Sequence, residues 1–168
     1  ALVNRKINVS SFKCGPDYID PMFHKTVIGT AAYNLDTYLM SNDAVNYLLN
    51  KNSGDIAVIE GVMGFYDGFS FTEKGSTHEL SEITDTDVIL VVNCRGMSLS
   101  AMALVKGFKE FRKNNIKGVI FNNLSEKLYG NLAEKCRKIG LTPLGFLPNI
   151  KDVQISSRHL GLVTAVEI

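Results

Sequence analysis

Cysteine is scarce in this sequence. Its 168 residues include three cysteines, Cys14, Cys94 and Cys136, and no two of them have the Cys-x-x-Cys spacing of a structural zinc site. Because free thiols are typical of a reducing compartment, we expect a cytoplasmic protein. Cys136 lies on the apolar face of a predicted helix and Cys94 follows an apolar run, so we favour small buried hydrophobes over reactive groups.

Long apolar runs and an excess of one charge are also missing. No stretch approaches the ~20 apolar residues that a membrane span requires, and the first residues do not read as a secretory signal. The 18 basic and 17 acidic side chains nearly cancel, so we expect neither a nucleic-acid nor a membrane partner. The length predicts a single domain, residues 1–168, with its own core.

Apolar runs alternate with segments of helical periodicity along the whole chain. Such alternation, with helical crossovers between apolar strands, predicts an α/β protein with a mostly parallel sheet and helices on both faces. The run 87–93 is the most hydrophobic and is expected at the centre of the sheet. The predicted strands are 7–13, 55–60, 87–93, 117–122 and 143–148.

The segment 55–68, DIAVIEGVMGFYDG, is the part of the chain most suggestive of chemistry. Its apolar half ends on Glu60, and a glycine-rich loop then carries Asp67. Ligands of open α/β sheets bind at the carboxyl ends of the strands, and a buried carboxylate there needs a partner. The residues leave two readings open for Glu60: a Mg²⁺ site, or a helix cap or arginine partner.

A second candidate segment, GPDYIDP at 15–21, follows the predicted strand 7–13. Its two prolines predict a rigid loop rather than a regular element. The loop carries Asp17 and Asp20 with Tyr18 between them. A solvated turn would also use aspartates, but Lys13 immediately before the loop favours a phosphate and metal site.

Residues 75–79, GSTHE, have the pattern of a helix start. Ser76 and Glu79 predict a capping box, and the free backbone N–H groups of the first turn could hold an anion. Capping alone explains both residues, so the anion site is the less favoured reading. His78 is expected at the surface or in packing rather than in catalysis.

Several of these segments together resemble the synthetase domain of the cobyrinic acid a,c-diamide synthases. The resemblance covers essentially the whole chain, and the pairing of GPDYIDP with EGVMGFYDG is its specific part. It implies the dethiobiotin-synthetase-like branch of the P-loop ATPases. The matching segments are FKCGPDYIDP at 12–21, NLD at 34–36, EGVMGFYDG at 60–68, GST at 75–77, GVIFN at 118–122 and RHLGL at 158–162.

The resemblance implies a ligase of cobalamin biosynthesis that uses ATP, Mg²⁺ and glutamine. In this family the a and c acetate side chains of cobyrinic acid become amides: the carboxylate is phosphorylated, and ammonia then displaces the phosphate. The implied partners are therefore cobyrinic acid, ATP and a glutaminase domain of the same full-length chain. The chemistry requires positioning and neutralisation of charge around the transferred phosphoryl group.

The same resemblance implies roles for residues near the first strand. Glu60 and Asp17 would hold Mg²⁺, and Lys13 would steady the transferred phosphate of the nucleotide. Asp17 and Asp20 would lie beside the reacting carboxylate, with Tyr18 and Ile19 contacting substrate.

Further roles follow for residues later in the chain. Asp67 would orient the substrate or the intermediate, so it joins Lys13, Asp17 and Asp20 as a candidate catalytic residue. Ser76 and Thr77 would receive a substrate carboxylate at a helix N-terminus. Asn122 would lie near the adenine of the nucleotide.

The sequence departs from the family pattern in one important feature. The P-loop pattern Gly-x-x-x-x-Gly-Lys-Ser/Thr, expected upstream of the strand near Ile7, does not occur. We therefore expect a domain truncated at its N-terminus, with residues 149–168 forming a connector toward a glutaminase domain. The chain alone would bind nucleotide poorly, and the sheet edge left exposed would favour a homodimer.

Two alternative functions remain open at this point. One is an amidoligase for another tetrapyrrole, such as nickel-sirohydrochlorin, which would use almost the same acids. The other is a non-catalytic P-loop-like scaffold, which the missing P-loop favours. The clustering of Asp17, Asp20, Glu60 and Asp67 near strand ends disfavours a scaffold, since a scaffold has no need of it.

Overall fold

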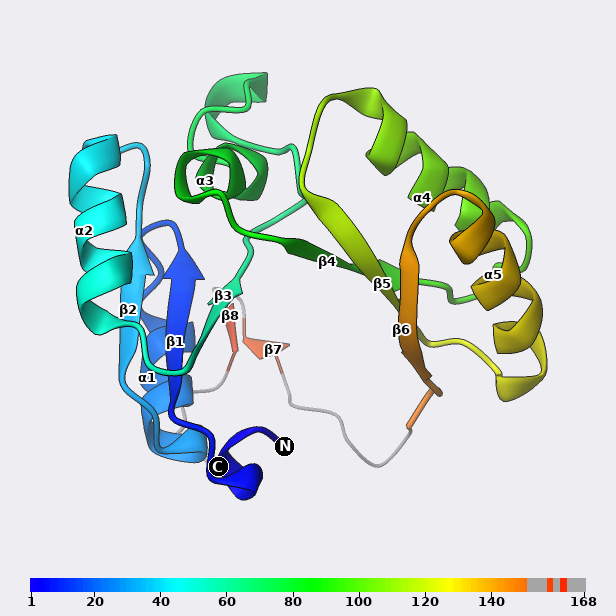
Figure 1. The fold of residues 1–168 in the computed structure, drawn as a ribbon, viewed down its shortest axis with the longest axis horizontal. Coiled ribbons are helices and arrows are strands. Elements are labelled where there is room, and N and C mark those ends of the chain that lie inside the picture. The colour runs from blue at the N-terminus through cyan, green and yellow to red at the C-terminus, as the bar shows by residue number, and fades with distance from the viewer. Residues whose placement is uncertain (151–156, 159–160, 163–168) are drawn as a thin grey trace. The chain divides into compact units, whose positions relative to one another are not determined.

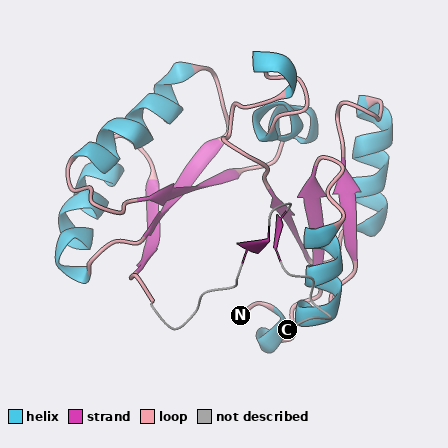
Figure 2. Ribbon diagram, turned by 180° about the vertical axis from the view of Figure 1, so that it is seen from behind, coloured by secondary structure: helices cyan, strands magenta, loops and turns pink. Residues whose placement is uncertain are grey.

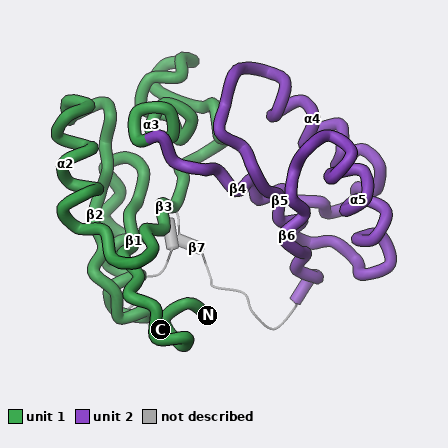
Figure 3. Tube along the Cα trace, in the orientation of Figure 1, with its two compact units in different colours: residues 1–84, 155–168 green, residues 85–154 purple. Residues whose placement is uncertain are grey.

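The computed structural model describes residues 1–150, 157–158 and 161–162 (Figure 1). The chain divides into two compact units: unit 1 comprises residues 1–84 and 155–168, and unit 2 comprises residues 85–154 (Figure 3). Parallel strands connected by helices form both units, which confirms the predicted α/β class.

Unit 1 is built on a parallel three-stranded sheet in the order β2-β1-β3. The central strand β1 (Val9–Cys14) pairs with β2 (Ala32–Leu35) on one side and β3 (Ile56–Glu60) on the other. In this register Lys13 lies opposite Asn34 and Glu60. The carboxyl ends of the three strands therefore bring these polar side chains to one edge.

Helices cover both faces of this sheet. Alternate residues of β1 point to opposite faces, and Phe12 and Cys14 face α2 (Asn42–Asn52) and α3 (Thr77–Thr84) in the main core. Ser11 and Lys13 face α1 (Ile19–Phe23) and the π-helical segment η2 (His24–Ile28). The buried members of the core are Phe12, Cys14, Leu35, Val45, Leu49 and Leu80.

The boundaries of α2 follow the sequence signals. Ser41 precedes the helix with an extended backbone, and its hydroxyl accepts a hydrogen bond from the N–H of Ala44 at 3.3 Å. Residues 1–84 also contain the short 3₁₀ segments η1 (Val3–Arg5) and η3 (Phe69–Phe71).

Unit 2 contains a second parallel sheet, in the order β4-β5-β6. Its strands are β4 (Val88–Asn93), β5 (Ile116–Asn122) and β6 (Thr142–Leu147). The expectation that the most hydrophobic run, now β4, would be central is wrong for this sheet, because β5 pairs with both neighbours. Strand hydrophobicity does not by itself determine the order of pairing: β4 buries Leu90 and Val92 but leaves Ile89 and Val91 more than half exposed.

In the described part of unit 2, the helices α4 (Ser100–Phe111) and α5 (Glu126–Lys138) lie on the same side of the sheet (Figures 1 and 2). Val92 and Phe121 are accordingly buried, whereas Val91 is 60% exposed. All three cysteines of the chain are free and buried, which confirms the burial predicted for Cys94 and Cys136. None of the helices in the described residues combines the length and hydropathy that a bilayer crossing demands.

Two local expectations need correction. The two prolines predict no regular element in the loop 15–21, but α1 begins at Ile19 and includes Pro21. Proline fits the first turn of a helix because the N–H groups there have no intrahelical acceptor. Strand β2 was not predicted, since a four-residue segment gives little periodicity.

The C-terminal stretch contains two more described elements. Strands β7 (Ser157–Arg158) and β8 (Gly161–Leu162) pair in antiparallel fashion. They fall within the predicted connector 149–168, and the other residues from 151 onward lie outside the described part of the chain.

Candidate active site

The side chain of Lys13 is the centre of an acidic cluster in unit 1. Its Nζ lies 2.7 Å from Asp20 Oδ2, 3.3 Å from Glu60 Oε1 and 3.9 Å from Asp17 Oδ2. The same ammonium donates a hydrogen bond to the carbonyl of Gly61 at 3.0 Å. Lys13 is only 5% exposed, so nearly all of its polar contacts are with the protein.

Local hydrogen bonds bring the acids to this lysine. Asp17 Oδ1 accepts from the N–H groups of Ile19 at 2.8 Å and Asp20 at 3.2 Å, which caps the start of α1. Asn34 Nδ2 donates to the carbonyls of Gly15 at 2.8 Å and Asp17 at 2.6 Å. The loop after β1 is therefore tied to β2, and it aims the first turn of α1 back at Lys13.

The pKa of Lys13 reflects a balance between burial and these acids. Burial favours the neutral amine and would lower the pKa, but the hydrogen bond to Asp20 and the charges of Glu60 and Asp20 outweigh it. The net effect raises the pKa of Lys13 above its ordinary 10.5. The site thus holds a permanent cation at neutral pH, a suitable neighbour for a phosphate.

Glu60 has a second partner, His24, to which none of the sequence motifs points. His24 Nε2 lies 2.8 Å from Glu60 Oε2, and His24 Nδ1 lies 2.7 Å from the hydroxyl of buried Ser11. One sequence signal could have found His24: it follows Asp20 by four residues, the spacing that places two side chains on one helix face.

The cluster can be tested for its fit to Mg²⁺. Within residues 1–150, no three His, Cys, Asp or Glu side chains converge as a metal cage. Mg²⁺ in nucleotide sites is commonly held by one or two carboxylates plus phosphates and waters. The side chains of Glu60 and Asp17 are 47% and 30% exposed, and each carboxylate oxygen has two lone pairs. These two carboxylates are therefore accessible oxygen donors of the kind that Mg²⁺ prefers.

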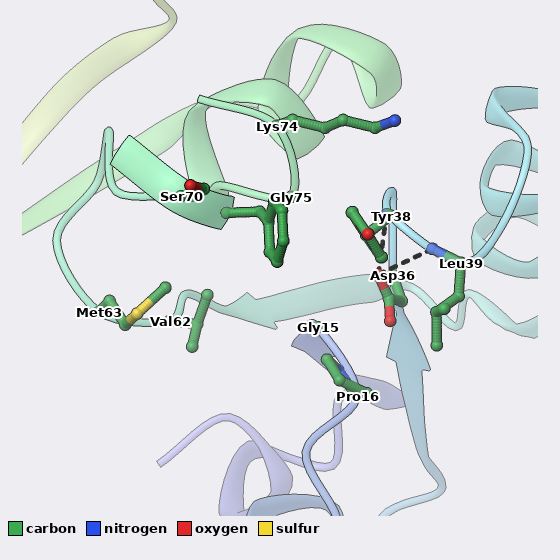
Figure 4. Close-up of a pocket in the computed structure, with 12 residues that line it drawn as sticks. Gly15, Pro16, Asp36, Tyr38, Leu39, Val62, Met63, Ser70, Lys74 and Gly75 are labelled. Atoms are coloured by element: carbon green, nitrogen blue, oxygen red, sulfur yellow. Dashed lines mark hydrogen bonds between the residues drawn. The ribbon is translucent and has the colours of Figure 1, made fainter. Parts of the chain in front are cut away.

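A cavity of about 480 Å³ opens beyond the same strand ends in unit 1 (Figure 4). Its wall is mainly apolar, with the rings of Tyr38 and Phe69 5.0 Å apart and the Nζ of Lys74 5.3 Å from the Tyr38 ring centre. The lining residues are Gly15, Pro16, Asp36, Tyr38, Leu39, Val62, Met63, Gly68, Phe69, Ser70, Lys74 and Gly75.

Among the described residues that line this cavity, Asp36 is the acid, and the motifs point to no role for it beyond the NLD segment. Its Oδ1 accepts from the N–H groups of Tyr38 at 2.8 Å and Leu39 at 3.2 Å (Figure 4). Its Oδ2 is buried and has no hydrogen-bond partner among the described residues. The two hydrogen bonds that Oδ1 accepts are those of an aspartate that stabilises a turn.

The other predicted substrate residues of unit 1 are more widely distributed. Tyr18 is 77% exposed beside the start of α1. Asp67 is exposed, and its Oδ2 accepts from the N–H of Gly64 at 3.1 Å. Ser76 is fully buried, with its hydroxyl accepting from the N–H of Glu79 at 3.1 Å, and Thr77 Oγ1 accepts from the N–H of Val62 at 2.9 Å.

The expected capping box takes a variant form. Glu79 Oε2 accepts a hydrogen bond from the N–H of Gly75 at 2.6 Å, and the same oxygen accepts from the hydroxyl of Thr37 at 2.7 Å.

Asn122 lies in unit 2, at the end of β5, where its Oδ1 accepts from the N–H of Asn123 at 3.0 Å.

Comparison with known proteins identifies the family. A family model described as an AAA domain matches residues 18–157. This chain belongs to the AAA domain family.

Three curated relatives of this chain share the same name. This chain is 42% identical over 165 residues to cobyrinate a,c-diamide synthase of Sulfolobus acidocaldarius, and the match covers 97% of this chain and 38% of the relative. It is 42% identical over 172 residues to the enzyme of that name from Thermoplasma volcanium, covering 100% and 38%. For Clostridium acetobutylicum the identity is 43% over 172 residues, covering 100% and 39%.

These matches confirm the resemblance found in the motifs. They also show that this chain spans less than two fifths of the length of these relatives.

Proposed function

We propose that this chain is the central and C-terminal part of the ATP-dependent synthetase domain of a cobyrinate a,c-diamide synthase. The observation that carries the proposal is the buried Lys13 ammonium, bracketed by Asp17, Asp20 and Glu60 where parallel strands end. The 42% identity to enzymes of that name supports the substrate. The whole protein would amidate the a and c acetate groups of cobyrinic acid in cobalamin biosynthesis.

The proposed reaction begins with a carboxylate of the substrate. Its oxygen attacks the terminal phosphorus of ATP, so that an acyl phosphate and ADP form. Ammonia from glutamine then attacks the acyl carbon, phosphate leaves with the C–O bond electrons, and loss of a proton gives the amide. Lys13, held by acids on several sides, would stabilise the negative charge of the transferred group.

The acids divide between two tasks in this proposal. Glu60 and Asp17 would hold Mg²⁺, which supplies neutralisation of phosphate charge when it is bound. Asp20, through its 2.7 Å ion pair, fixes Lys13. Asp67 would orient the substrate or intermediate.

Substrate and nucleotide contacts complete the assignment. Exposed Tyr18 and neighbouring Ile19 would touch the substrate, and Ser76 and Thr77 at the start of α3 would lie near one of its carboxylates. Asn122 would contact the adenine. The cavity lined by Tyr38 and Phe69 suits the apolar edge of a large ring, since ligand cavities are mostly apolar with few polar groups.

The partners follow from the same proposal. Residues 149–168 would connect to a glutaminase domain that supplies ammonia, both units would belong to one synthetase domain, and two copies would form a homodimer. A cytoplasmic setting fits the free, buried thiols.

Amidation by an extended chain tests the function. The extended chain is this sequence continued upstream through the segment in which the P-loop is expected. It would receive ATP, Mg²⁺, ammonia in place of glutamine, and cobyrinic acid, with products followed by mass spectrometry. We expect mono- and diamide formation that is lost in Glu60→Ala and kept in Glu110→Ala, a matched change at an exposed glutamate paired with Lys106.

Other outcomes of this experiment would change the proposal. Amidation of nickel-sirohydrochlorin but not of cobyrinic acid would support the proposed mechanism and change the proposed substrate. Full activity of Glu60→Ala would remove the metal role of Glu60. An absence of turnover with every macrocycle would favour the scaffold.

A further inference from the structure

The carboxylate of Glu60 is held from two sides. Oε1 lies 3.3 Å from the ammonium of Lys13, and Oε2 lies 2.8 Å from His24 Nε2. Behind His24, the hydroxyl of Ser11 lies 2.7 Å from Nδ1. A continuous chain of hydrogen bonds therefore runs from Ser11 through the imidazole to the end of β3.

The direction of each hydrogen bond follows from the chemistry of the groups. An ionised carboxylate offers lone pairs only, so Nε2 of a neutral imidazole must carry the proton and donate a hydrogen bond to Glu60. Nδ1 then has a lone pair, and the hydroxyl of Ser11 donates to it. Ser11 and Glu60 together allow one tautomer of neutral His24.

The fold places these groups with little freedom. Ser11 and Lys13 are two residues apart on β1 and point to the same face. His24 is the first residue of η2, directly after α1. π-Helical segments are rare and frequently occur at functional sites. The side chain of His24 is only 14% exposed, so its ring is fixed by surrounding protein.

We infer that His24 is a positioning residue for Glu60, and that Ser11 fixes the tautomer in which His24 does this. A metal-bound carboxylate is commonly oriented by a hydrogen-bond partner outside the metal's own ligands. The role in Mg²⁺ binding rests on the function proposed above, whereas the hydrogen-bond chain does not. His24 would act through Glu60 and would not touch the substrate.

Nitrogen NMR of the extended chain, with isotope-labelled histidines, tests directly the hydrogen bonds that connect Ser11, His24 and Glu60. When the imidazole is neutral, the Nε2–H tautomer is expected for His24, with signals assigned by their loss in His24→Gln. Glu60→Gln should weaken this preference, because an amide can also donate to Nε2. His78, which lies 3.5 Å from Glu73, provides an internal reference that should not change. A wild-type His24 in the Nδ1–H tautomer would overturn the inference.

A double-mutant cycle tests the positioning role. His24→Leu removes the donor to Glu60, and we expect the Mg²⁺ concentration for half-maximal amidation to rise about 10- to 100-fold. His24→Gln keeps an N–H donor and should recover most of this loss. Ser11→Ala should have a smaller effect, which disappears in the His24→Gln background because Ser11 acts only through the imidazole.

Ser10→Ala is the matched control for Ser11→Ala. Ser10 is also a buried serine of β1, but its hydroxyl accepts from the N–H of Gly54 at 2.8 Å. We expect Ser10→Ala to change thermal stability without changing the Mg²⁺ dependence. Equal effects of His24→Leu and His24→Gln, or an undiminished Ser11→Ala effect in the double variant, would refute positioning. If no variant catalyses amidation, the proposed function fails, while the NMR result still decides the hydrogen-bond chain.

Discussion

At the scale of single residues, Lys13 brings a positive charge into a site that also holds three carboxylates. Its side chain is 6% exposed, and that of its nearest partner, Asp20, is 19% exposed. Taking such groups out of water is costly, and their mutual attraction offsets this cost only while all partners are present. Removal of the lysine is therefore expected to cost more than a surface substitution.

Lys13→Met should lower the free energy of unfolding by about 3 kcal/mol, the lower end of the range for a broken buried ion pair. We choose the lower end because the Glu60 side chain is 47% exposed. Urea unfolding would measure the change. Lys138→Met is the matched control: Lys138 lies 2.6 Å from Glu134, but their side chains are 69% and 63% exposed, so no clear loss is expected. Similar losses in both variants would contradict the cluster.

The raised pKa of Lys13 predicts how this stabilisation depends on pH. A cation whose pKa is higher in the folded state stabilises fully below the ordinary pKa of 10.5, and loses this effect as the pH rises through the folded value. The stability difference between wild type and Lys13→Met should stay constant from about pH 7 to 9 and shrink above about pH 10.5. Unfolding by urea at a series of pH values checks this, and a difference that grows at alkaline pH would have the wrong sign.

At the scale of elements, the loop after β3 is defined by close packing against the start of α3. A Cβ placed on Gly61 would lie 2.9 Å from Thr77 Oγ1 and 3.0 Å from its Cγ2. Thr77 is also the acceptor for the N–H of Val62 at 2.9 Å. The absence of a side chain at Gly61 thus allows the backbone directly after Glu60 to pack against Thr77 of α3.

Two Gly→Ala substitutions should therefore change the free energy of unfolding in opposite directions. Gly61→Ala pushes against Thr77 and should destabilise by about 1–3 kcal/mol, the usual cost of overpacking. Gly130→Ala, inside α5 where nothing lies within 4 Å of a new Cβ, should stabilise by up to about 1 kcal/mol because alanine favours a helix. Thermal or urea unfolding of each variant measures both, and stabilisation by Gly61→Ala would show that the contact relaxes freely.

At the scale of the whole molecule, the chain has candidate acids for an ATP-dependent reaction but no Gly-x-x-x-x-Gly-Lys-Ser/Thr sequence. In P-loop proteins the backbone of that sequence cradles the phosphates, and its lysine reaches the terminal groups. Lys13 and Glu60 would supply charge and a metal ligand, but they provide no such cradle.

The 168-residue chain should accordingly bind ATP with Mg²⁺ much more weakly than the extended chain. Isothermal titration calorimetry of both would measure the two dissociation constants, with the Glu60→Ala extended chain as a control for the metal-dependent part. Tight binding by the 168 residues alone would show that their own loops suffice for phosphate binding.

The sequence by itself determined the α/β class, most of the strands and helices, and the acids beside Lys13. These are properties of local pattern: apolar runs bounded by glycine predict strands, and acids at strand ends mark the ligand edge of a parallel sheet. The family resemblance also needed only the motifs, because their residues are contiguous along the chain.

Only the tertiary structure decided that β5, not β4, is the middle strand of its sheet, and that Pro21 lies inside a helix. It alone joined Ser11, His24 and Glu60, which are separated by 13 and 36 positions in the chain. Pairing order and side-chain contacts depend on which segments share a core, and local periodicity carries no information about this choice. The partners of a candidate acid are therefore the part of a site that packing, rather than pattern, determines.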